Sequence, residues 1–217
     1  MLEISSVLKI YNNKNILSDI YLKCEVGDIL AVFGRNGSGK STLFEIIFGT
    51  RNAQNKFIKI DNIVCNKAYT MRNRINYLTQ ESFIPSHLSI KKVLSLYISE
   101  NLIGEFCNDE VLLPFIDDKI KTLSGGELRY FELKLLLYQK SKFLLLDEPF
   151  TGMSPILKNI AKALIITHSP EKGIIISDHD YQSVIEIAHK NYLLKDGYLK
   201  EIEDLNALIH NGYLSAN

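Results

Sequence analysis

The order of apolar and polar residues predicts several strands in the first part of the chain. Residues 2–11 and 16–26 alternate apolar and polar positions, as half-buried strands do. The Asn-Asn-Lys-Asn run between them is rich in turn-forming residues, so the two segments predict a hairpin. Residues 29–33 are wholly apolar, and shorter strands are expected at 57–60 and 75–79.

The second half of the chain alternates strand and helix patterns, which is typical of an α/β core. Residues 143–146 and 173–177 are dominated by apolar side chains and predict strands buried on both faces. The Asp-Gly pair at 196–197 is a strong hairpin signal for flanking strands at 192–195 and 198–202. Helices are predicted at 42–48, from Ser89 onward, at 127–140 and at 155–166, and shorter ones begin at 108 and 204.

Residues 81–122 interrupt the α/β pattern. After Ser89, apolar side chains recur at the three- and four-residue spacing of one helix face. This stretch therefore predicts a helical insertion. We expect a single domain over 1–217, in which an α/β core at 1–80 and 141–217 carries a helical subdomain at about 81–140.

Composition excludes several classes of function. The 217 residues are 46% hydrophobic, which suits one domain with a sizeable core. The 25 basic and 25 acidic residues balance, so no general attraction to nucleic acid or to an anionic membrane is expected. No stretch reaches the roughly 18 apolar residues of a membrane span, and the first residues lack a signal-peptide layout. The 3 scattered cysteines form neither a disulfide framework nor a metal motif, and a reducing cytosol is the simplest setting.

A phosphate-binding loop is predicted at residues 34–42, which read Gly-Arg-Asn-Gly-Ser-Gly-Lys-Ser-Thr between a strand and a helix. Its glycines let backbone N–H groups point at a polyphosphate, and the following helix adds its positive N-terminal end. Lys40 is expected to reach the β- and γ-phosphates, and the Ser41 hydroxyl to bind Mg²⁺. The predicted nucleotide contacts are Gly34, Arg35, Asn36, Gly37, Ser38, Gly39, Lys40, Ser41 and Thr42.

Two carboxylates follow the predicted strand 143–146. Asp147 and Glu148 stand at the carboxyl end of this strand, where α/β folds bind ligands. Asp147 is expected to hold Mg²⁺, directly or through water, and Glu148 to orient and deprotonate the attacking water. In isolation the pattern suits a strand end with two solvated acids, but the phosphate-binding loop upstream favours the catalytic interpretation.

Residues 123–127 read Leu-Ser-Gly-Gly-Glu, and with the two motifs above they resemble the signature of the ATP-binding cassette (ABC) ATPase family. Ser124, Gly125 and Gly126 at a helix N-terminus would form a second phosphate cradle, although a lone Ser-Gly-Gly turn can also be a simple helix cap. The resemblance implies an α/β P-loop NTPase of the ABC type, with a mixed central sheet, an N-terminal antiparallel β portion and an inserted helical subdomain. It also implies ATP hydrolysis, with the signature of one subunit closing on the ATP held by another.

Three further positions match functional residues of the family. Gln80, after a predicted strand, matches the glutamine that contacts Mg²⁺ and water and signals to the partner domain. His179, also after a strand, matches the switch histidine, which contacts the γ-phosphate. Tyr11 matches the aromatic residue that stacks on adenine. His168 follows a predicted helix instead of a strand, and we expect it to be a solvated turn residue.

One position departs from the family pattern. Ser154 stands where the family commonly has an aspartate that helps to couple the two ATP sites. A hydroxyl cannot accept charge-assisted hydrogen bonds as a carboxylate does, so hydrolysis is expected to be slower or less tightly coupled. The insertion, which is the docking surface in transporters, is also short.

The resemblance implies an ATPase subunit, with ATP and Mg²⁺ as cofactors, that drives a separate transmembrane permease. It implies pairing with a second ABC subunit, most simply another copy, and a position on the cytoplasmic face of the cell membrane; no nucleic acid partner is expected. Two alternatives stay open at this point: a non-transport ABC ATPase similar to the iron–sulfur-assembly ATPase, and a nucleotide-binding regulator with weak hydrolysis. Neither the cargo nor the direction of transport follows from a nucleotide site.

Overall fold

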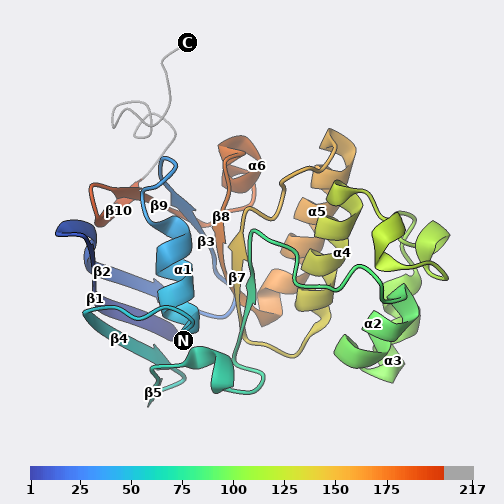
Figure 1. Cartoon of the computed structure of the whole chain (residues 1–217), viewed down its shortest axis with the longest axis horizontal. Helices are drawn as coiled ribbons and strands as arrows, with labels where there is room; N and C mark the ends of the chain where they lie inside the picture. The colour runs from blue at the N-terminus through green and yellow to red at the C-terminus, as the bar shows by residue number, and fades with distance from the viewer. Residues whose placement is uncertain (203–217) are drawn as a thin grey trace, which may run out of the picture.

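The computed structural model describes residues 1–202, whose strands form two sheets (Figure 1), so the helix expected from 204 lies outside the described residues. The smaller sheet is antiparallel, has the order β2-β1-β4-β5 and contains the predicted N-terminal hairpin. Asn12 and Asn13 at the hairpin turn have positive φ angles of 44° and 61°, which asparagine tolerates better than most residues. The strands are β1 (Leu2–Tyr11), β2 (Lys14–Cys24), β4 (Asn55–Ile60) and β5 (Ile63–Val64).

The larger sheet has 6 strands in the order β10-β9-β3-β8-β7-β6. Strands β6, β7, β8, β3 and β9 run parallel, and β10 pairs antiparallel with β9, so the sheet is mixed as predicted. Because parallel strands end at the same edge of a sheet, the segments that follow β3, β6, β7 and β8 meet there. The strands are β3 (Ile29–Phe33), β6 (Ile75–Leu78), β7 (Phe143–Asp147), β8 (Gly173–Ser177), β9 (Lys190–Lys195) and β10 (Tyr198–Ile202).

Helices pack on both faces of the larger sheet: α1 on one face, and α4 and α5 on the other (Figure 1). The insertion carries α2 and α3, which lie at the opposite end of the molecule from the antiparallel sheet (Figure 1). None of the helices in residues 1–202 has the length and hydrophobicity that a bilayer crossing requires. The α-helices are α1 (Lys40–Phe48), α2 (Ile90–Tyr97), α3 (Glu100–Cys107), α4 (Gly125–Tyr138), α5 (Pro155–His168) and α6 (Tyr181–Ile185), and 3₁₀ turns lie at Ala68–Thr70, Leu113–Phe115, Ile120–Thr122 and Ser169–Glu171.

Cap residues explain where the helices of the insertion begin and end. Ser89 caps α2 by accepting a hydrogen bond from the Lys92 N–H (3.2 Å), as predicted. The helix expected to begin at 108 is wrong, because α3 ends at Cys107 and the Asn108 N–H donates to the Gly104 carbonyl (3.1 Å). Asparagine is common at both ends of helices, so the residue type alone does not tell a start from an end.

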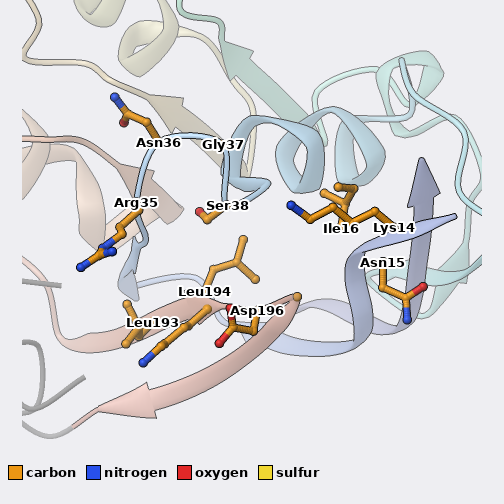
Figure 2. Close-up of a pocket in the computed structure, with 12 residues that line it drawn as sticks. Lys14, Asn15, Ile16, Arg35, Asn36, Gly37, Ser38, Leu193, Leu194 and Asp196 are labelled. Carbon is orange, nitrogen blue, oxygen red and sulfur yellow. The ribbon is translucent and has the colours of Figure 1, made fainter. Parts of the chain in front are cut away.

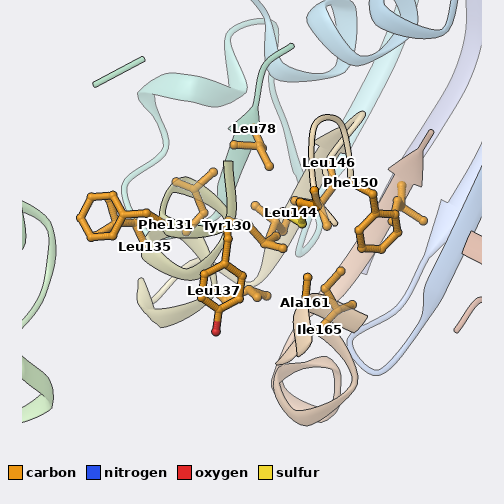
Figure 3. Close-up of a cluster of buried hydrophobic side chains, with 14 of the residues drawn as sticks. Leu78, Tyr130, Phe131, Leu135, Leu137, Leu144, Leu146, Phe150, Ala161 and Ile165 are labelled. Atoms are coloured by element: carbon orange, nitrogen blue, oxygen red, sulfur yellow. The ribbon is translucent and has the colours of Figure 1, made fainter. Parts of the chain in front are cut away.

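Alternate residues of the buried strands supply two hydrophobic cores, one on each face of the larger sheet. In β7, Leu144 and Leu146 face α4 and α5 (Figure 3), whereas Phe143 and Leu145 face α1 and the antiparallel sheet. This burial on both faces explains why β7 is a continuous apolar run without polar alternation. It also holds Asp147, the last residue of β7, in a fixed position where the parallel strands end.

A buried ionic cluster attaches the insertion to α4. Lys134 is 3% exposed, donates to the Phe106 carbonyl (2.8 Å) and forms an ion pair with Asp109. The Tyr130 hydroxyl donates to the same carboxylate (2.6 Å). Since an unpaired buried charge is costly, these side chains hold the segment after α3 firmly against the middle of α4.

Candidate functional site

The phosphate-binding loop connects β3 to α1, as predicted from its position in the sequence. The helix α1 begins at Lys40 instead of Thr42, because Gly39 is its cap residue with a φ of 106°. This left-handed conformation is disfavoured for residues that carry a Cβ atom, which is why the loop needs glycine here. The loop therefore leads directly into the N-terminal turn of a helix, where anions are stabilised.

The side chain of Lys40 folds under the phosphate-binding loop. It is 6% exposed, and its ammonium donates to the carbonyls of Gly34 (2.6 Å) and Arg35 (3.3 Å). Burial lowers the pKa of Lys40, and the nearby carboxylates of Asp147 and Glu148 oppose that shift. The ammonium group of Lys40 is therefore bonded to two carbonyls of its own loop.

Asp147 offers an oxygen atom without a hydrogen-bond donor. The carboxylate is 1% exposed, and its Oδ2 accepts a hydrogen bond from the Tyr77 hydroxyl (3.1 Å). Its Oδ1 is buried and has no hydrogen-bond partner among the described residues. Burial raises the pKa of Asp147, while the hydrogen bond from Tyr77 and the positive charge of Lys40 oppose the rise. A buried carboxylate oxygen with no donor is a favourable ligand for a hard cation.

Glu148 has a strained backbone that turns the chain sharply after β7. Its φ is 54°, a left-handed value that is uncommon for a residue with a side chain. The Glu148 N–H donates to the Ser177 carbonyl (2.6 Å), so the β7–β8 hydrogen-bond ladder continues for one residue beyond the strands. Strain of this kind is held by the surrounding structure and is common at functional sites.

The carboxylate of Glu148 contacts side chains from two other segments and one from the loop that follows it. Its Oε1 lies 2.8 Å from His179 Nε2 and accepts a hydrogen bond of 2.8 Å from the Gln80 amide. Its Oε2 accepts a hydrogen bond from the Thr151 hydroxyl (3.3 Å). The Gln80 amide also lies 3.3 Å from Ser41 Oγ. Gln80, Ser41, Glu148 and His179 therefore meet, although the sequence separates them widely.

A cavity of about 440 Å³ lies above these groups and is bordered by the phosphate-binding loop. Tyr11 stands at its rim, with Lys9 Nζ 4.6 Å from the ring centroid and a hydrogen bond from Arg51 to its hydroxyl. An exposed aromatic ring at this place is suited to stacking on a base. The lining residues are Tyr11, Ile16, Asn36, Gly37, Gly39, Lys40, Ser41, Thr42, Gln80, Glu148 and His179.

A second cavity, of about 610 Å³, lies on the other side of the phosphate-binding loop (Figure 2). It is bounded by the start of β2 and by the β9–β10 hairpin, and Asn36 and Gly37 line both cavities. The predicted nucleotide contacts Arg35 and Ser38 line this second cavity and not the first. The loop therefore borders both cavities, and only some of its residues line the first cavity, which Lys40 also lines.

The signature turn (residues 124–126) is separate from the first cavity. Ser124 and Glu127 form a reciprocal capping box at the start of α4: the Ser124 N–H donates to Glu127 Oε2 (2.8 Å) and the Glu127 N–H to Ser124 Oγ (3.3 Å). Ser124 and Gly125 are exposed, Gly126 is buried, and none of the three lines the cavity. Within one chain, the second predicted phosphate cradle is thus not joined to the first.

Arg129 is the principal side chain that the sequence analysis does not assign to the site. Its guanidinium is 6% exposed and donates to the carbonyls of Thr79 (2.6 Å), Glu148 (3.1 Å) and Asp147. It also lies 3.6 Å from the buried carboxylate of Glu132. Burial lowers the pKa of Arg129 and the Glu132 charge opposes this. One arginine therefore holds the ends of β6 and β7 together. In the sequence, its place among the apolar residues of a predicted helix is the feature that indicates a buried arginine.

The structure corrects the prediction on His168 and shows the local role of Ser154. His168 is not a solvated turn residue: it ends α5, its Nδ1 lies 3.0 Å from the Leu164 carbonyl, and its ring centroid is 5.0 Å from that of Tyr138. The helix extends to this residue, so the imidazole can bond one turn back along it. Ser154 is the N-cap of α5, and its hydroxyl accepts a hydrogen bond from the Leu157 N–H (3.3 Å).

Comparison with known proteins decides the family. The sequence profile of the family "ABC transporter" matches residues 17–151. The chain is 32% identical over 209 residues to the lipopolysaccharide export system ATP-binding protein LptB of Escherichia coli (strain K12), a match that covers 89% of this chain and 86% of LptB. The chain belongs to the ABC transporter family. As a member of that family it is an ATP-binding subunit that hydrolyses ATP.

Solved structures confirm the predicted fold class for this ABC subunit. The ATP-binding subunit of an ABC transporter superposes with a TM-score of 0.84 at 20% identity, covering 100% of this chain and 95% of the other. The ATP-binding cassette MJ0796, in a dimeric post-hydrolysis state bound to ADP and Pi, gives 0.77 at 21% identity and covers 94% and 100%. At such identities the likeness concerns the fold alone.

Replacing either of the two glycines of the signature turn by alanine is expected to change the stability of the protein by different amounts. A Cβ atom at Gly126 would overlap the Gly152 carbonyl oxygen, whereas one at Gly125 would meet no heavy atom within 4 Å. Gly126→Ala is therefore expected to lower the free energy of unfolding by about 1–3 kcal/mol, measured by urea denaturation. Gly125→Ala is the matched control, with an expected change below about 0.5 kcal/mol. Equal losses at both positions would contradict the described packing of α4 on the Gly152 loop.

Proposed function

We propose that this ABC subunit works as a pair of copies that enclose two ATP molecules between them and so drive a separate membrane permease. The observation that carries the proposal is the exposure of Ser124 and Gly125 at the tip of α4, outside the cavity that Lys40, Gln80 and Glu148 line. A second copy can supply this tip to the open side of the cavity. The dimeric state of the MJ0796 cassette, with ADP and Pi, supports the pairing.

In this proposal the phosphate-binding loop holds the triphosphate of ATP through its backbone N–H groups. Lys40 leaves the carbonyls of Gly34 and Arg35 to contact the β- and γ-phosphates. Tyr11, whose exposed ring stands at the rim of the cavity, stacks on adenine. From the second subunit, Ser124 and the backbone of Gly125 and Gly126 contact the γ-phosphate, where the α4 N-terminus favours negative charge.

A magnesium ion fits the donor set beside the phosphates. Asp147 would contribute its free Oδ1, Ser41 its hydroxyl, and Gln80 its side-chain oxygen after the amide, whose N–H now points at Ser41, has turned, directly or through water. Mg²⁺ prefers such oxygen ligands together with phosphates and waters. When bound, the ion neutralises charge that develops on the β- and γ-phosphate oxygens.

Hydrolysis in this proposal begins with a water held by Glu148. The water oxygen bonds to the γ-phosphorus as the bond to the β–γ bridging oxygen breaks, and Glu148 takes a proton from the water. His179 contacts the γ-phosphate, and Lys40 offsets the charge that spreads over its oxygens. Gln80 and His179 also contact the Glu148 carboxylate, so the attacking water competes with them for its oxygens.

The permease is the proposed partner of the helical subdomain, about 81–140. Exposed apolar side chains occur there at Leu96, Tyr97 and Leu113, and such residues suit contact with another protein. The similar LptB is named as part of a lipopolysaccharide export system, which favours transport over a non-transport role. The subunit is accordingly placed on the cytoplasmic face of a membrane, bound to the permease.

Glu148→Gln is expected to lower kcat by about 10²- to 10³-fold, because the amide cannot accept the proton of the attacking water. ATP binding is expected to persist and to convert the protein to a dimer on gel filtration. Exposed Glu110 provides the control Glu110→Gln, with unchanged turnover and no ATP-dependent dimer. An unmutated protein that binds ATP, yet releases no phosphate with Mg²⁺ even beside its permease, would instead support a nucleotide-binding regulator.

The permease partner is tested by purification from native membranes. Tagged protein, extracted in mild detergent, is expected to retain a polypeptide with several membrane spans, identified by mass spectrometry. The same experiment with Leu96→Glu is expected to recover less of it, since a charge replaces an exposed apolar contact. Recovery of iron–sulfur-assembly proteins without any membrane polypeptide would overturn the transport proposal in favour of the non-transport alternative.

A further inference from the structure

Two loops leave the larger sheet side by side after β7 and β8. The backbone ladder between these strands ends with the hydrogen bond from the Glu148 N–H to the Ser177 carbonyl. Pro149 has no N–H, so the next donor on the β7 side is that of Phe150, which is 1% exposed. A buried N–H of this kind requires an acceptor.

The carboxylate of Asp178 supplies that acceptor and joins the two loops. Asp178 is 3% exposed, and its Oδ2 accepts the hydrogen bond of the Phe150 N–H at 2.9 Å. Its Oδ1 accepts from the Asp180 N–H, also at 2.9 Å. One oxygen thus holds the loop that follows Glu148, and the other holds the loop that carries His179.

A second connection runs parallel to the first. Asp180 caps α6 by accepting from the Ser183 N–H (3.2 Å), and its carboxylate also pairs with Lys158 of α5. Because α5 begins directly after the loop 149–154, this pair ties the far end of that loop to the His179 loop (residues 178–180). The two loops are therefore joined at both ends and are expected to move as one unit.

The loop 149–154 lies where a second subunit would reach it. Its residues Thr151, Gly152 and Ser154 are exposed, and the Gly152 carbonyl packs against Gly126 of the signature turn. The exposed tip of α4 and this loop consequently share one surface. A partner that binds the tip also touches the loop.

We infer that Asp178 is a positioning residue that transmits contact with the second subunit from the loop 149–154 to His179 and so aligns it for hydrolysis. The inference rests on the proposed two-subunit site. The inference also bears on Ser154, which stands where the family commonly has an aspartate. In this chain, the buried carboxylate of Asp178 links the loop 149–154 to the His179 loop.

Asp178→Asn tests the inference with minimal change of shape. The amide has a single acceptor oxygen, so only one of the two backbone N–H groups keeps its partner. We expect kcat to fall about ten- to a hundredfold, as for the loss of a hydrogen bond to a charged group, and KM for ATP to change less than about threefold. A kcat within about twofold of the unmutated protein, in a variant that folds, would overturn the inference.

A double-mutant cycle with His179 separates positioning from plain stability. If Asp178 acts through the histidine, Asp178→Asn is expected to cost less than about twofold in a His179→Ala background. The rates are measured in single-turnover reactions with radiolabelled ATP, which detect slow hydrolysis. The same fold-loss in both backgrounds would mean that Asp178 only stabilises the fold and would overturn the inference.

Lys162→Gln is the matched control, because Lys162 and Glu186 form an ion pair between α5 and α6 outside the two loops. This variant is expected to keep kcat within about twofold of that of the unmutated protein. If Asp178→Asn does not fold, Lys158→Gln is tested instead, because it removes the ion pair with Asp180 at a half-buried position. We expect kcat to fall about two- to fivefold, which is the effect of one ion pair, and not to fall in a His179→Ala background. No loss in Lys158→Gln, or an equal loss in both backgrounds, would overturn the inference.

The two levels of the account fail in different ways. Full turnover of Asp178→Asn with an inactive Glu148→Gln would remove only the role of Asp178. Absence of an ATP-dependent dimer in Glu148→Gln would remove the proposed two-subunit site itself.

Discussion

The parallel register of the larger sheet is the constraint on which the site depends. Strands β3, β6, β7 and β8 run in one direction, so the segments that follow them are brought to one edge even though they are remote in sequence. Arg129 strengthens this edge by donating to three backbone carbonyls at the ends of β6 and β7. A shift of one strand would separate Gln80, Glu148 and His179, which now bond to one another.

Most polar side chains of the site are bonded to other groups of the same chain. Lys40 rests on carbonyls of its own loop, and Glu148 is held by Gln80 and His179. Binding of ATP therefore exchanges existing hydrogen bonds for new ones, and the net gain is smaller than a count of contacts would indicate. Asp147 Oδ1 and Ser38 Oγ are exceptions, since both are buried and have no hydrogen-bond partner among the described residues.

Local patterns predicted most of the elements and the motifs that border the cavity. The phosphate-binding loop, the apolar strand of β7 and the Ser89 cap depend on neighbours within a few residues, so the sequence alone reveals them. Tyr77 and Asp178 could not be assigned in this way, because their roles depend on which strand lies beside which. Arg129 belongs to the same class, since its acceptors come from two strands. Strand order is a long-range property, and the patterns within a single sequence do not specify it.

In the proposed pair, each ATP is held by the phosphate-binding loop of one subunit and the signature turn of another. A crystal structure of Glu148→Gln grown with ATP and Mg²⁺ tests it most directly. The account predicts a symmetric pair in which Lys40 of one copy and Ser124 of the other both contact the same γ-phosphate. A structure in which the nucleotide is bound while Ser124 of every copy faces solvent, with scattering in solution that fits single chains, would contradict it.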